Sequence, residues 1–226
     1  MPADIRKLHD FLVEHSFYPL VLSTLLATSF FIWRFFYSGS TNYINLMWNL
    51  FLAWVPYVLS LLAAGIRQVG KGTWPVLLIL GVGWLVFFPN APYLVTDFYH
   101  LDTRPPVPFW YDIGLIAVFA FTGCFLAIAS LRTMHLLVEE YLGGLAGWLF
   151  SLFALAMAGL GVYLGRFGRW NSWDLLLHPR SLLKEIALQV LNPLDNLGFV
   201  GFTLMFTSIL VVFYLMFMSS RNRKGG

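Results

Sequence analysis

The feature that most constrains this chain is a series of long apolar stretches, because about 20 helical residues are enough to cross the hydrocarbon core of a bilayer. Of the 226 residues, 59% are hydrophobic and only 11% are charged, whereas soluble domains carry roughly 25% charged residues. The pattern predicts an all-α polytopic membrane protein. We expect one integral membrane domain over residues 1–226, with six spans near residues 17–37, 44–66, 73–95, 112–136, 145–166 and 197–219.

Two segments outside the spans have apolar residues at helical spacing. Residues 4–15 carry Leu8 and Leu12 on one face, and residues 179–191 begin with a proline, which fits the first position of a helix. Both are predicted to be amphipathic helices. They either lie on the membrane surface or pack against neighbouring loops.

The third span is interrupted near its end by Pro89, Asn90 and Pro92. Proline removes a backbone donor and breaks the helical hydrogen-bond ladder. Within a membrane the freed backbone groups need protein or water partners, and irregular backbone is tolerated where it lines a cavity. We therefore expect a functional region near this break.

Charge on the loops predicts the orientation. With the N-terminus inside, eight Lys and Arg residues face the cytoplasm and six face the opposite side, so both termini are expected to be cytoplasmic. The net charge of +3 is mild and spread along the loops, which does not indicate nucleic-acid binding. The single cysteine, Cys124, excludes a disulfide within the chain and a thiolate metal cluster.

Polar side chains are costly in membrane spans, so their placement is informative. Under the predicted topology they gather on the outer side, mainly in two segments that we expect to be loops, residues 89–101 and 165–174. We expect these two segments to touch. Three asparagines, Asn45, Asn49 and Asn90, are candidate structural polar residues at the same side.

These segments also carry a family resemblance. Residues 88–101, 110–112, 165–174 and 48–54 resemble shared motifs of a bacterial membrane-protein family catalogued as domain of unknown function number 1361. The resemblance extends over nearly the whole chain. It implies a multi-span protein of the prokaryotic cytoplasmic membrane, and it implies no particular reaction or ligand.

Asp97 and His100 are the first candidate site. Their spacing of three places them on one face of a helical turn, and a carboxylate with an imidazole can begin a Zn²⁺ or Mn²⁺ site. With Asp112 they form a candidate catalytic set that binds a divalent metal or transfers protons. In the alternative interpretation, Asp97 caps a short surface helix and His100 lies at the headgroup level.

Arg166, Arg169, Asn171 and Asp174 are the second candidate site. Arginine binds phosphate or carboxylate through two parallel hydrogen bonds, so this group could hold an anion or a lipid headgroup. The alternative is an internal salt bridge from an arginine to Asp174, Asp97 or Asp112 that joins the loops.

Two further patterns concern packing. Gly161 and Gly165 have the small-residue spacing that permits close helix contact, with either an internal partner or another copy of the chain. Arg132 and His135, toward the inner end of the fourth span, are expected to extend to the cytoplasmic interface.

Three functions remain open at this point. One is a non-catalytic accessory or assembly subunit, surrounded by membrane lipids, whose outer loops dock a protein partner in the membrane. Another is a metal-dependent hydrolase or transferase that acts on a lipid-linked or anionic substrate at the outer face. The third is a small-solute transporter with its site at the broken end of the third span.

Overall fold

The computed structural model describes residues 3–68 and 70–222, and within these ranges every regular element is helical. This confirms the all-α class. The elements are α1 (Ala3–Glu14), α2 (Phe17–Ser38), α3 (Ile44–Arg67), η1 (Lys71–Thr73), α4 (Trp74–Phe87), α5 (Asn90–Tyr93), η2 (Leu94–His100), α6 (Phe109–Leu142), α7 (Gly144–Phe167), α8 (Asp174–Leu177), α9 (Pro179–Leu191) and α10 (Leu197–Asn222).

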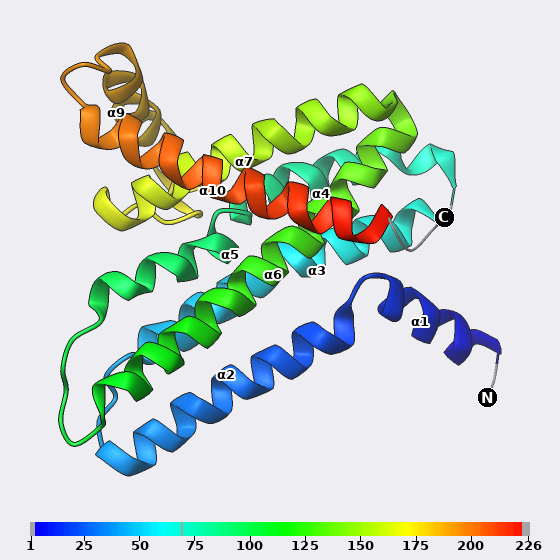
Figure 1. Cartoon of the computed structure of the whole chain (residues 1–226). Helices are drawn as coiled ribbons and strands as arrows, with labels where there is room; N and C mark the ends of the chain where they lie inside the picture. The colour runs from blue at the N-terminus through cyan, green and yellow to red at the C-terminus, as the bar shows by residue number, and fades with distance from the viewer. Residues whose placement is uncertain (1–2, 69, 223–226) are drawn as a thin grey trace.

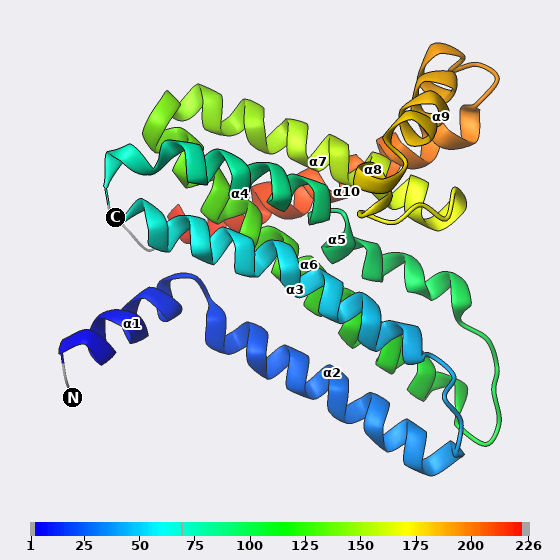
Figure 2. The same ribbon diagram turned by 180° about the vertical axis from the view of Figure 1, so that it is seen from behind.

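In the described part of the chain, six helical stretches are long and apolar enough to cross a membrane, and they match the six predicted spans. The chain is a multi-pass membrane protein. The long helix α6 lies at the centre of the bundle, where it packs against α2, α3 and α7, while α4 lies on α3 and α10 lies on α7 (Figures 1 and 2). The exposed apolar side chains of the outer helices are those expected to face lipid.

Loops that carry many of the polar residues lie together at one end of the bundle, which we call the polar end. It holds residues 39–43, 101–108 and 168–173, while α1 and the end of α10 lie toward the opposite end (Figure 1). Both predicted polar segments reach this end, because η2 leads into residues 101–108 and α7 leads into residues 168–173.

The third span breaks where the prolines predicted, but the segment after the break is not a loop. Helix α4 ends at Phe87, and the chain resumes as α5 and then as the 3-10 helix η2, which ends at His100. Pro89 has the helical φ of −59°, and proline fits the start of a helix because its missing N–H has no helical partner there. The expectation of a loop over residues 89–101 was therefore wrong.

Glycines allow this broken segment to pack tightly between α6 and α7. A Cβ atom at Gly161 would lie 2.6 Å from Pro89 Cγ, and one at Gly123 would lie 2.8 Å from Leu94 Cδ1. Gly165 similarly approaches the Tyr93 ring. The close contact predicted for Gly161 and Gly165 therefore has a partner within the chain.

Both predicted amphipathic helices are present as α1 and α9. Leu182 of α9 is buried, so this helix packs one side against the protein beside the end of α7. Helix α1 contacts α2, and its Leu8 side chain is exposed.

Candidate functional site

Arg166 joins the two predicted polar segments at the polar end. From the last turn of α7 its guanidinium reaches η2, where Nη2 donates to Asp97 Oδ1 over 2.7 Å. Nε and Nη2 both donate to the Thr96 hydroxyl, at 3.0 and 2.7 Å, and Nη1 lies 2.6 Å from His100 Nε2. The predicted contact between the two segments is confirmed.

The geometry of η2 explains why Asp97 and His100 share this partner. In a 3-10 helix, residues three apart are eclipsed, so both side chains point to the same side. A guanidinium can only donate, so His100 Nε2 accepts and the proton of the neutral imidazole lies on Nδ1. The expected common face of Asp97 and His100 is present, and Arg166 lies against it.

Each oxygen of the Asp97 carboxylate has a partner, because Asn49 of α3 donates to Oδ2 over 3.0 Å. The side chains of Asp97 and Arg166 are only 6% and 7% exposed. The Arg166 guanidinium also lies over the Tyr93 ring, 4.6 Å from its centroid. Among the described residues, no group of three or more His, Cys, Asp and Glu side chains is arranged to hold a metal ion.

Asp112, the third candidate catalytic residue, has a different partner from Asp97 and His100. It lies in the first turn of α6 and accepts two hydrogen bonds from Arg34 of α2, at 2.7 and 3.0 Å. Both side chains are almost completely buried. Asp112 is outside the lining of the small cavity that Asp97 and His100 share, and its carboxylate is paired with Arg34, whereas Asp97 and His100 are partners of Arg166.

Tyr43 contacts Arg34 of one ion pair and lines a small cavity with Asp97 of the other. The guanidinium of Arg34 is 4.7 Å and that of Arg104 is 5.0 Å from the ring centroid, and burial raises the pKa of the phenol. Asn45, one of the candidate structural asparagines, lines a small polar cavity of about 140 Å³ here together with Asp97 and His100.

We call Arg166 and its partners Thr96, Asp97 and His100 the Arg166 cluster. A larger cavity of about 450 Å³ adjoins this cluster. It lies beside the break in the third span, which confirms that the irregular backbone lines a cavity. Its walls come from α3, α4, α5, α7, the segment before α8, α8 and α9, through Trp48, Asn49, Leu52, Leu85, Val86, Pro89, Asn90, Tyr93, Met157, Leu160, Gly161, Leu164, Gly165, Arg169, Trp170, Asn171, Ser172, Leu175, Leu182 and Ile186.

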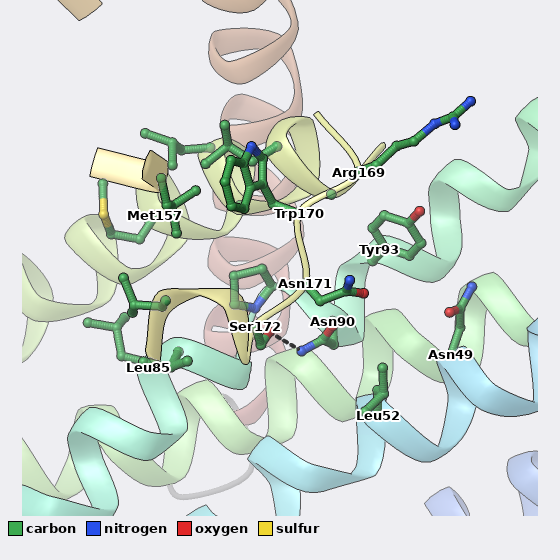
Figure 3. A pocket seen from close by; sticks show the side chains of 18 of the residues that line it. Asn49, Leu52, Leu85, Asn90, Tyr93, Met157, Arg169, Trp170, Asn171 and Ser172 are labelled. Carbon is green, nitrogen blue, oxygen red and sulfur yellow. Dashed lines mark hydrogen bonds between the residues drawn. The ribbon is translucent and has the colours of Figure 1, made fainter. Parts of the chain in front are cut away.

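The lining of this cavity is amphipathic. Figure 3 shows Met157 and Leu85 toward one side, and Asn49 and Tyr93 toward the other, where Leu52 adds an apolar side chain. Asn90 lies between them and donates to the Phe87 carbonyl at 2.9 Å and to the Ser172 hydroxyl at 2.8 Å, which ties the end of α4 to the segment before α8.

The predicted anion-binding set is divided by the fold. Arg166 is held in its ion pair, while Arg169 is exposed at the rim of the cavity in the left-handed conformation, with φ 57°. Asp174 accepts the backbone N–H of Asn171 over 2.7 Å, so these two residues stabilise the turn before α8.

Two arrangements were missed from the sequence. Arg34 was one of the six charges expected on the outer side, although a charge near the end of an apolar run can also indicate a buried partner. His135 does not extend to the interface as expected: its side chain is buried, and its Nδ1 lies 2.7 Å from the Tyr214 hydroxyl and 2.9 Å from that of Ser151. Packing of α7 and α10 around α6 encloses it.

Comparison with known proteins gives a family and no relative of known activity. A family model described as protein of unknown function (DUF1361) matches residues 48–213. No curated protein and no solved structure matches the chain. The matched residues include the break in the third span, the Arg166 cluster and all of the cavity-lining residues named above. The chain is therefore a multi-pass membrane protein that belongs to the DUF1361 family.

Proposed function

We propose that this protein is a non-catalytic accessory subunit that holds an amphipathic, lipid-like ligand in the 450 Å³ cavity. The observation that carries the proposal is the division of that cavity into an apolar side and a polar side. Its volume falls in the range of roughly 300–1,000 Å³ typical of small-molecule sites. An apolar chain would lie against Leu85 and Met157, with the polar group near Asn49 and Tyr93.

The Arg166 cluster supports a structural role for the predicted catalytic residues. Asp97 already accepts hydrogen bonds from Asn49 and Arg166, and His100 accepts from Arg166. Each oxygen of the Asp97 carboxylate thus has a donor, and the side chain is only 6% exposed, which favours a structural role over metal binding or proton transfer. In the present arrangement the cluster fixes Asn49 and Tyr93, which are two lining residues of the cavity.

The proposed setting is a prokaryotic cytoplasmic membrane, with the polar end outside and both termini inside. The excess of Lys and Arg on the opposite side supports this orientation. In that orientation the cavity would take its ligand from the outer leaflet, and a protein partner would dock at the exposed loops of the polar end.

Native mass spectrometry of the gently solubilised protein tests the proposal. The wild type should retain a lipid-sized adduct, which extraction and mass analysis would identify. In Leu160→Trp the larger side chain would fill part of the cavity from α7, and the adduct should be lost.

The matched control is Leu149→Trp on the same helix. Leu149 is exposed and does not line the cavity, so this variant should keep the adduct. A wild type without an adduct, or a Leu160→Trp variant that retains it as well as Leu149→Trp does, would contradict the proposal.

A further inference from the structure

The charge of the cavity identifies the class of ligand, provided that the proposed function is correct. Of the side chains that line the cavity in the described part of the chain, Arg169 is the one that carries a charge at neutral pH. The remaining polar lining is neutral, from asparagine amides, a serine hydroxyl, a tyrosine hydroxyl and tryptophan N–H groups.

Nearby carboxylates already have partners. Asp97 accepts from Asn49 and Arg166, and Asp174 accepts from the backbone of Asn171. Glu185 of α9 accepts from the indole N–H of Trp170 over 2.6 Å. These acids therefore stabilise the walls of the cavity.

Arg169 differs from them, because no hydrogen bond or ion pair joins its side chain to the described residues. Figure 3 shows its guanidinium extending from the rim, beyond Tyr93, while Trp170 lies among the apolar side chains. The left-handed backbone at Arg169 turns the chain at this point. Within the described ranges, the rim thus presents an unpaired cation beside the polar side of the cavity.

We infer that the ligand is an anionic amphiphile whose phosphate or carboxylate group is bound by Arg169. A guanidinium offers a planar pair of donors that matches either group. Asn171 and Asn49 supply neutral donors at the same rim and wall. A free phosphate ion shares this chemistry, so lipid and ion have to be separated by experiment.

The test compares phosphatidylglycerol with phosphatidylcholine, each supplied to the purified full-length protein, with bound lipid counted by native mass spectrometry. The wild type should retain phosphatidylglycerol in preference. Arg169→Gln should reduce its retention about tenfold or more, since a hydrogen bond to a charged group is lost, while phosphatidylcholine retention stays unchanged. Arg169→Lys should recover only part of the preference, because an ammonium lacks the planar pair of donors.

Arg180→Gln is the matched control, because Arg180 is an exposed residue of α9 outside the cavity lining and its loss changes the net charge equally. This variant should retain phosphatidylglycerol and phosphatidylcholine as the wild type does.

Equal retention of the two lipids by the wild type, with loss of both in Leu160→Trp, would overturn the inference and leave the proposed function standing. A wild type that retains neither lipid would overturn both. Displacement of bound phosphatidylglycerol by inorganic phosphate would support anion recognition at Arg169. An inorganic phosphate adduct without bound lipid would overturn the inference that the ligand is an amphiphile.

Discussion

Replacing Arg34 with methionine should destabilise the protein strongly, although this residue touches no proposed ligand. Methionine keeps much of the length and apolar surface of the side chain but removes the guanidinium. The Asp112 carboxylate would lose both of its hydrogen bonds, at 2.7 and 3.0 Å, while remaining fully buried among apolar residues. The cation over the Tyr43 ring would be lost as well.

The expected size follows from burial. Removing one partner of a buried ion pair costs about 3–5 kcal/mol, because the other charge stays buried and unpaired. For a chain of this length each kcal/mol lowers the melting temperature by roughly 2–4 °C, so Arg34→Met should lower it by roughly 6–20 °C. Arg67 and Glu140 form the contrasting pair, with side chains 18% and 51% exposed. Arg67→Met should cost about 0–1 kcal/mol.

Thermal unfolding in one detergent, followed by intrinsic fluorescence and by loss of soluble monomer, measures both variants beside the wild type. The double variant Arg34→Met with Asp112→Leu should recover most of the lost stability, because apolar residues of similar volume can replace a buried ion pair at little cost. A single Arg34→Met variant no less stable than Arg67→Met, or a double variant as unstable as the single one, would refute the reasoning.

Three further predictions test other parts of the structure. Gly159→Val should cost about 1–3 kcal/mol of stability in the same unfolding assay, since its Cβ would overlap α10, and unchanged stability would contradict the α7–α10 contact. Asp97→Asn should lower stability by about 3 kcal/mol by removing the charge that partners Arg166; a loss of ligand binding or activity at full stability would instead point to a direct role. For topology, single cysteines at exposed Asp102 and at exposed Gln68 are compared in a Cys124→Ala background. The cysteine at position 102 should react with a membrane-impermeant maleimide on intact cells, and the one at position 68 only after lysis. The reverse labelling would invert the proposed orientation.

The helices were predictable because each depends mainly on local composition. Apolar runs of about 20 residues leave a chain few alternatives, since in a bilayer the backbone must satisfy its own hydrogen bonds. The prolines likewise located the break in the third span. What local pattern did not reveal was that the chain resumes a helix after Pro89, because proline is compatible both with a loop and with a first helical turn.

The candidate site was predicted in part. Clustering of polar residues at one end indicated that residues 89–101 and 165–174 would touch, and the Asp97–Arg166 pair confirms this. Spacing could not assign the partners: Asp112 was grouped with Asp97, but it binds Arg34, which is 78 residues away in the sequence. Pairing over such distances depends on how helices pack, and the sequence left those contacts open.

By itself, then, the sequence determined an all-α membrane protein with six spans, two amphipathic helices and a polar end, because hydrophobic length and charge placement act locally. Only the tertiary structure decided that Arg166 is held in an ion pair while the Arg169 side chain has no partner among the described residues, although the two arginines are three residues apart. The physical reason is that α7 ends at Phe167 and the backbone turns left-handed at Arg169, so Arg169 lies beyond the helix that carries Arg166, at the rim of a cavity that three spans and α9 line together.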